Sequence, residues 1–302
     1  MKSYIERAIE LAKAKRKHVE PSQEPIESQV EAAGRDNVKR RRTYAVPHRA
    51  TNGHPASASH LPPIDLAKTP AVTTDGGILR HNRVLVESDP MQPASNAYRM
   101  LRTRVMRQMR MNGWRRLGIT AAAPNEGKTL TAINLAVAIA AEHVQPVVLV
   151  DLDLRRPRAH QYLGIDKSQF TSVGDYLEGR TNSLDQLVVT LSEQGLSCIL
   201  SARPYERSSD LLASPQGQAF LADLANRLPD ALLIFDLPPL LSTDDPLVVA
   251  PMLDALLLVV AEKGAPRSDV ASAAKLLSEF NLLGTVLNKS VERSDPGYYA
   301  YY

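Results

Sequence analysis

The chain has 302 residues, of which 44% are hydrophobic and 23% charged, and these values exclude a collagen-like, a disulfide-rich and a wholly disordered protein. Its single cysteine, Cys198, excludes an intramolecular disulfide bond. The formal net charge of +3 at pH 7 is too small to indicate a nucleic-acid partner, and we expect none.

The sequence contains no segment typical of a membrane or secreted protein. The first residues lack the uninterrupted apolar run of a secretory signal. The longest apolar runs, such as residues 255–261, are much shorter than the roughly 20 residues of a membrane-spanning helix. We therefore expect a cytoplasmic protein that reaches a membrane only through a partner or a surface contact.

The first 95 residues contain nine prolines and few apolar clusters, which is typical of a linker. The first part is an exception, because Ser3 and Glu6 have the spacing of a capping box and apolar residues recur on one helical face. We predict an amphipathic helix over residues 1–20 and a flexible linker over residues 21–95.

From residue 96 onward, helical and strand patterns alternate. A helix is expected from residue 96 until Asn112 and Gly113 end it. The strands that follow are apolar nearly throughout, which indicates a parallel sheet covered by helices on both faces. We predict strands near residues 117–121, 147–151, 197–200, 231–236, 255–260 and 283–287, and helices near residues 128–142, 215–227 and 268–280. The predicted fold is an α/β, doubly wound, mainly parallel sheet over residues 96–294.

The first of these strands leads into a loop that ends Gly127-Lys128-Thr129 and is followed by a helix. Such a loop is typical of a phosphate-binding site, because its backbone N–H groups and the helix N-terminus surround a phosphate. Lys128 would neutralise the phosphate oxygens and Thr129 would ligate Mg²⁺. Ala122 replaces the first glycine of the general pattern, so the loop alone is a weak match. The expected nucleotide-binding residues are Asn125, Glu126, Gly127, Lys128, Thr129 and Leu130.

Three aspartates are expected at the carboxyl edge of the sheet, close to this loop. Asp151 and Asp153 end one strand, and Asp236 ends another. Ligands of doubly wound sheets bind at this edge, and Mg²⁺ takes one or two carboxylates together with phosphate oxygens. We therefore expect Lys128 and the three aspartates to be catalytic, and Thr129, Asp153 and Asp236 to hold the metal. Either Asp151 or Asp153 could instead accept a proton from the phosphate acceptor.

The segment 295–302 carries the candidate acceptors of the phosphate. Four of the ten tyrosines lie in the last five positions, where no core can form: Tyr298, Tyr299, Tyr301 and Tyr302. A phenol has a pKa near 10, so a nearby carboxylate that accepts its proton would assist the transfer. We expect this tail to enter the active site of a neighbouring copy.

Together these features resemble the bacterial tyrosine autokinases of exopolysaccharide loci, in particular the free-standing form that accompanies exosortase systems. The resemblance rests on the loop, on Asp-Leu-Asp-Leu-Arg-Arg-Pro at residues 151–157, on Phe-Asp-Leu-Pro-Pro at residues 235–239 and on the tyrosine-rich tail. It implies a P-loop NTPase of the deviant Walker type related to Min and Par proteins. It also implies ATP and Mg²⁺ as cofactors and an adenine contact from Asn288.

The resemblance further implies partners. They are a membrane chain-length-determinant protein that activates the kinase and recruits it to the inner face of the membrane, other copies of the same protein, and a cognate tyrosine phosphatase as a further candidate. Family members often carry a glutamate three residues before the first of two arginines, here Arg99 and Arg102, for a ring-forming contact, whereas this sequence has Asn96 there. Ring assembly is therefore implied less strongly than nucleotide binding.

Two other functions are compatible with a phosphate loop. A positioning ATPase of the Min or Par type would carry a lysine early in the loop, where this sequence has Ala123, and would lack a tyrosine tail. A nucleotide-binding adaptor without catalysis would not need Lys128 and all three aspartates. Both patterns favour the kinase.

Overall fold

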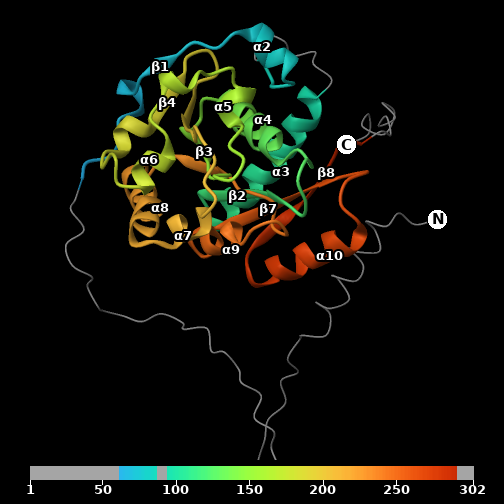
Figure 1. Cartoon of the computed structure of the whole chain (residues 1–302). Coiled ribbons are helices and arrows are strands. Elements are labelled where there is room, and N and C mark those ends of the chain that lie inside the picture. The colour runs from blue at the N-terminus through green and yellow to red at the C-terminus, as the bar shows by residue number, and fades with distance from the viewer. Residues whose placement is uncertain (1–60, 87–93, 291–302) are drawn as a thin grey trace, which may run out of the picture. The chain divides into compact units, whose positions relative to one another are not determined.

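The computed structural model describes residues 61–86 and 94–290 (Figure 1). The predicted helix over residues 1–20 and the predicted tail over residues 295–302 lie outside the described residues. No helix in the described part of the protein is long and apolar enough to cross a membrane.

The centre of the described part is an eight-stranded sheet with the strand order β1-β4-β5-β3-β6-β2-β7-β8. The strands are β1 (Ala71–Val72), β2 (Arg116–Ala121), β3 (Val147–Asp151), β4 (Val188–Leu191), β5 (Leu196–Ile199), β6 (Leu232–Asp236), β7 (Ala255–Ala261) and β8 (Leu282–Asn288). Neighbouring strands are parallel except β4 and β5, which form an antiparallel pair. The predicted α/β, mainly parallel fold is confirmed.

Helices cover both faces of this sheet (Figure 1). They are α2 (Gly76–His81), α3 (Ser95–Asn112), α4 (Lys128–Ala140), α5 (Ala159–Tyr162), α6 (Val173–Leu177), α7 (Ser208–Ala213), α8 (Pro215–Arg227), α9 (Asp245–Val249) and α10 (Arg267–Leu276). Short 3-10 helices span Leu66–Lys68, Lys167–Gln169, Leu184–Leu187, Ala250–Met252 and Leu277–Glu279.

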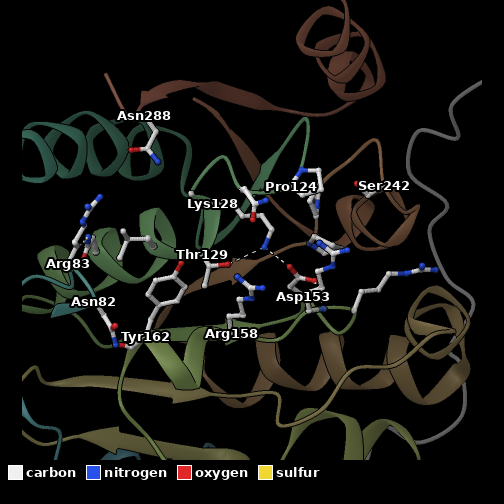
Figure 2. A pocket seen from close by; sticks show the side chains of 18 of the residues that line it. Asn82, Arg83, Pro124, Lys128, Thr129, Asp153, Arg158, Tyr162, Ser242 and Asn288 are labelled. Atoms are coloured by element: carbon white, nitrogen blue, oxygen red, sulfur yellow. Dashed lines mark hydrogen bonds and ion pairs between the residues drawn. The ribbon is translucent and has the colours of Figure 1, made fainter. Parts of the chain in front are cut away.

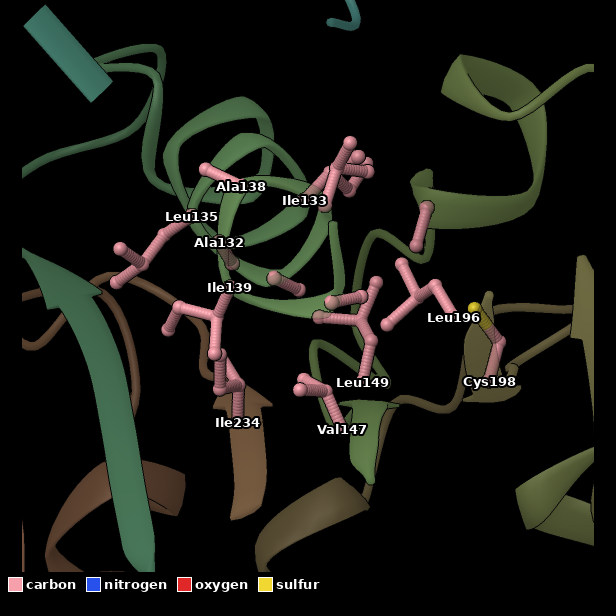
Figure 3. Close-up of a cluster of buried hydrophobic side chains, with 14 of the residues drawn as sticks. Ala132, Ile133, Leu135, Ala138, Ile139, Val147, Leu149, Leu196, Cys198 and Ile234 are labelled. Carbon is pink, nitrogen blue, oxygen red and sulfur yellow. The ribbon is translucent and has the colours of Figure 1, made fainter. Parts of the chain in front are cut away.

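The alternation of side chains along each strand produces two cores. In β3, Val147 and Leu149 belong to the cluster beneath α3 and α4, whereas Val148 and Val150 belong to the cluster beneath α6 and α8. Figure 3 shows the first cluster, with Leu149 and neighbouring strand residues packed against α4. Because both faces are buried, the strands are almost wholly apolar, and this made them recognisable from the sequence.

The prediction of a linker over residues 21–95 is wrong for residues 61–86. Strand β1 pairs with β4, and the buried residues of this segment include Val72, Leu79, Val84, Leu85 and Val86. The elements here have two to six residues, which is too short for a helical or strand period to be visible in the sequence. The segment therefore extends the folded unit beyond the predicted boundary at residue 96.

Candidate functional site

A cavity of about 810 Å³ opens at the carboxyl ends of the central strands (Figure 2). Its volume is in the range of ordinary small-molecule sites. The wall contains Asn125, Gly127, Lys128, Thr129, Leu130, Asp153 and Asn288, which the sequence had singled out. The fold therefore brings these side chains together in one cavity, and the structure adds the contacts between them.

The loop before α4 has the backbone conformation of a tight phosphate cradle. Asn125 and Gly127 have positive φ angles of 64° and 92°, which glycine and asparagine adopt more readily than other residues. A Cβ atom on Gly127 would lie 2.1 Å from Nδ2 of Asn288, so no other side chain fits there without movement. The loop thus leaves the N-terminus of α4 open to the cavity.

The side chain of Glu126 stabilises this loop through hydrogen bonds to the backbone. Its carboxylate is almost fully buried and accepts hydrogen bonds from the backbone N–H of Ala123 at 3.0 Å and of Ala265 at 3.2 Å. The Glu126 side chain is therefore occupied by the protein's own backbone, and its predicted contact with a nucleotide would come from its backbone N–H.

Lys128 lies among the predicted acids (Figure 2). Its Nζ atom is 2.6 Å from Oδ2 of Asp153, 3.4 Å from Oδ1 of Asp236 and 3.1 Å from Oγ1 of Thr129. All four side chains are buried. The ammonium group therefore neutralises two carboxylates at the place where a phosphate would bind.

Burial and mutual repulsion perturb the pKa values of these groups. Burial raises the pKa of Asp236 to about 6, although the Lys128 charge opposes this shift. Burial, followed by the charges of Asp236 and Asp153, raises the pKa of Asp151 well above its ordinary value. Burial lowers the pKa of Lys128, but the nearby aspartates outweigh it and the net shift is upward. The cluster therefore has an excess of carboxylates that a further cation would relieve.

The residues fit a magnesium ion held jointly with phosphate. Oδ2 of Asp236 is buried without a hydrogen-bond partner, and such an atom is costly unless a ligand satisfies it. No group of three or more His, Cys, Asp and Glu side chains among residues 61–86 and 94–290 is arranged to hold a metal. A site of one or two carboxylates plus Thr129 agrees with the ligand preference of Mg²⁺, which keeps phosphate and water ligands.

Asp151 and Asp153, which the sequence could not distinguish, have different positions. Asp153 lines the cavity and contacts Lys128. Asp151 is absent from the cavity wall, is fully buried, and its Oδ1 accepts a hydrogen bond from the backbone N–H of Asp153 at 3.1 Å. Asp153 is thus the carboxylate of the pair that a ligand can reach.

The last strand also contacts the loop. Nδ2 of Asn288 donates to the carbonyl oxygen of Glu126 at 2.8 Å, and Nζ of Lys289 donates to the carbonyl oxygen of Asn125 at 2.6 Å. Asn288 lines the cavity, and its amide supports the loop. The four predicted phosphoacceptor tyrosines, Tyr298, Tyr299, Tyr301 and Tyr302, lie outside the described residues.

Known proteins resemble this chain over about three quarters of its length. No protein-family model matches the sequence. The chain is 29% identical over 236 residues to the tyrosine-protein kinase YwqD of Bacillus subtilis, a match that covers 76% of this chain and 96% of YwqD. It is 30% identical over 224 residues to the putative tyrosine-protein kinase EpsB of Ralstonia solanacearum, covering 28% of EpsB and 74% of this chain. The chain thus spans nearly all of one relative and less than a third of the other.

Solved structures agree with these relatives. The kinase domain of the Escherichia coli tyrosine kinase ETK has a TM-score of 0.60 at 27% identity, over 70% of this chain and 82% of that domain. The chimerical protein CapA2B2 has a TM-score of 0.61 over 77% of this chain and 96% of the chimera; at 21% identity it supports the fold alone. The chain belongs to the bacterial tyrosine kinases.

Several residues of the kinase cavity were not predicted from the sequence. They include His81, Arg83, Tyr98, Arg158, Tyr162, Ser242 and Thr243. Arg158 follows directly after the Arg-Arg-Pro motif, so the motif could have indicated it. Arg83 comes from the segment that was predicted as a linker, and no pattern in the sequence pointed to it.

The arginines that the family resemblance associated with ring assembly have partners within the kinase. Arg102 forms an ion pair with Glu142 at 2.9 Å and donates to the carbonyl oxygen of Ala138 at 3.0 Å. Arg99 donates to Oδ1 of Asn96 at 2.5 Å. Arg102 therefore stabilises the packing of α3 on the end of α4, which is a role that needs no second copy.

Proposed function

We propose that the kinase transfers the γ-phosphate of ATP, with Mg²⁺, to the C-terminal tyrosine cluster of a neighbouring copy. The presence of Lys128, Thr129 and Asp153 in one cavity wall, with the buried Asp236 carboxylate 3.4 Å from Nζ of Lys128, supports the proposal. The acceptors would be Tyr298, Tyr299, Tyr301 and Tyr302, which lie outside the described residues. Their number at one end of the sequence supports their assignment.

Each side chain would have a separate task. Lys128 would exchange its contacts with Asp153 and Asp236 for the β- and γ-phosphate oxygens, which carry the same sign of charge as the two carboxylates. Thr129, Asp153 and Asp236 would hold Mg²⁺, which neutralises phosphate charge when bound. Phosphoryl transfer depends mainly on such positioning and charge stabilisation.

The phenol of the acceptor loses a proton during the transfer. Asp153 faces the cavity and is within reach of a ligand, so its carboxylate would accept this proton when it is not itself a ligand of the metal. Asp151 would act through Asp153, because its carboxylate holds the Asp153 backbone N–H. Asn288 would remain at the nucleotide end of the cavity and keep the loop in place, besides contacting adenine.

We further propose that this activity regulates the polymerisation or export of an exopolysaccharide. One relative, from Klebsiella pneumoniae, is named a putative tyrosine-protein kinase in the cps region. The activator would be a membrane chain-length-determinant protein, which would recruit the kinase to the inner face of the membrane. A cognate tyrosine phosphatase would remove the phosphate groups from the tail.

The test uses the purified full-length protein with ATP and Mg²⁺, followed by mapping of phosphotyrosine by mass spectrometry. We expect phosphate on the last five residues in the wild type and none in Lys128→Met. If the wild type is silent alone, the cytoplasmic tail of the membrane partner is added. ATP hydrolysis without phosphotyrosine in both conditions would contradict the proposal and favour a positioning ATPase.

A further inference from the structure

Residues 81–86, which we call the strap, are hydrogen-bonded to α4, the helix that follows the phosphate loop. Oδ1 of Asn134 accepts a hydrogen bond from the backbone N–H of Leu85 at 2.9 Å. Nδ2 of the same side chain donates to the carbonyl oxygen of Arg83 at 3.0 Å. Asn134 is itself buried, and its bond to the Leu85 amide is shielded from water. The helix that begins at Lys128 therefore fixes the strap.

The strap is also fastened to α5, which follows the motif of residues 151–157. Nδ2 of Asn82 donates to the carbonyl oxygens of Gln161 and Tyr162 at 3.1 and 3.0 Å. The backbone N–H of Val84 donates to the carbonyl oxygen of Leu79 at 2.8 Å. Because it is tied to both helices, the strap has a fixed position at the edge of the cavity.

Arg83 has an unfavourable backbone conformation within this strap. Its φ angle is 61°, a left-handed value that glycine and asparagine adopt more readily than arginine does. The local chain geometry therefore gives no reason for an arginine. Residues held in such conformations are concentrated at functional sites, and the side chain of Arg83 lines the cavity.

The position of Arg83 in the cavity is on the nucleotide side. Figure 2 shows Arg83 on the same side of Lys128 as Asn288, whereas Ser242 lies on the opposite side. The Arg83 side chain is exposed to the cavity and forms no ion pair with any residue of the described part. Arg158 also lines the cavity, so the positive charge of the two arginines favours an anion.

We infer that Arg83 binds the phosphates of the nucleotide on the side of the ribose, and that the strap is therefore part of the nucleotide site. A guanidinium group suits this role because it donates two parallel hydrogen bonds to phosphate oxygens. The inference rests on the proposed function, since it requires a nucleotide at the loop. It adds a residue that lies before the predicted kinase domain and is not part of the phosphate loop or of the aspartate motifs.

The test is the titration of the full-length protein with Mg²⁺ and ADP by calorimetry, with Arg83→Asn as the main variant. Asparagine tolerates the left-handed backbone, so this change removes the charge without adding strain, and thermal unfolding verifies that the variant is folded. We expect ADP to bind about tenfold more weakly, as for the loss of one charge-assisted hydrogen bond. The matched control is Arg80→Ala in α2, which is exposed and absent from the cavity wall; it should bind as the wild type does.

A second measurement does not depend on a variant. If the strap is part of the site, ADP should slow the hydrogen exchange of the Leu85 amide, which is bonded to Asn134, by a factor that grows with ADP concentration. Unchanged ADP affinity in Arg83→Asn, or equal weakening in Arg80→Ala, would overturn the inference. Failure of the wild type to bind ADP or ATP would instead overturn the proposed function.

Discussion

The amide of Asn288 donates a hydrogen bond to the carbonyl oxygen of Glu126, which lies 162 positions earlier in the sequence. This contact ties the end of β8 to the phosphate loop. The same amide occupies the space that a side chain on residue 127 would need. The side chain of Asn288, at the end of β8, thus packs closely against Gly127 of the loop.

This contact predicts the behaviour of Asn288→Ala. Loss of the bond should loosen the loop, so binding should weaken about three- to tenfold for inorganic tripolyphosphate, which has no adenine, and at least as much for ATP. The measurement is competitive displacement of a fluorescent nucleotide. An adenine contact without loop support would weaken ATP alone and leave tripolyphosphate unchanged. Leu287→Ala, at an exposed neighbouring position of β8, is the control and should change neither.

The raised pKa of Asp236 predicts a dependence of stability on pH. The pKa is about 6 in the fold, against an ordinary value of 3.8. Ionisation of this carboxyl is therefore disfavoured in the folded state, and its contribution to stability is present below about pH 4 and lost as the pH rises through about 6. Asp236→Asn, which cannot ionise, should have a Tm equal to the wild type near pH 4 and a higher Tm at pH 7.5.

Nucleotide binding should have the opposite dependence on pH, because it requires the ionised carboxylate of Asp236. Mg²⁺ needs the ionised carboxylate, so the affinity of the wild type for Mg²⁺ and ADP should fall as the pH drops below about 6. Calorimetric titrations at pH 5 and pH 7.5 would measure this difference. If Asp236→Asn had a lower Tm than the wild type at pH 7.5, the stability prediction would be contradicted, because the ion pair of Asp236 with Lys128 would then outweigh the cost of burying the carboxylate.

The buried strap and β1 predict where the protein can be truncated. Deletion of residues 1–86 removes Val72, Leu79, Val84, Leu85 and Val86 from the core. Each buried aliphatic side chain contributes about 1.5–3 kcal/mol, and the total approaches the whole stability of a typical domain. We expect no cooperative unfolding transition for this deletion by circular dichroism. Deletion of residues 1–60 should keep the transition, and its loss there would contradict the boundary.

The sequence predicted the parts of the fold that carry a clear period. Strands such as β3 and β6 are buried on both faces, so their apolar runs were recognisable, and each ends in an aspartate of the site. The loop was recognisable because its chemistry requires Gly127 and Lys128. Both types of signal are local, and the carboxyl edge of a parallel sheet brings them together.

The parts that the sequence did not predict depend on contacts between distant residues. The strap has no period of its own, and its position is set by the side chains of Asn134 and Asn82. Strand β4 is an antiparallel partner of β5 and was missed as well. Asp151 and Asp153 are both buried, and they differ because only Asp153 lines the cavity; two neighbouring aspartates at the end of one strand do not reveal this in sequence.

The central claim is transfer of phosphate between copies, and a mixing experiment of two variants tests it most directly. The acceptor variant is Lys128→Met with an intact tail, and the donor variant keeps Lys128 but lacks the last five residues. Incubated separately with ATP and Mg²⁺, and with the partner's cytoplasmic tail if the wild type requires it, neither should acquire phosphotyrosine in the tail. When they are mixed, mass spectrometry should find it on the tail of the acceptor variant. Phosphotyrosine on the acceptor variant alone, or an unlabelled mixture under conditions in which the wild type labels itself, would contradict the account.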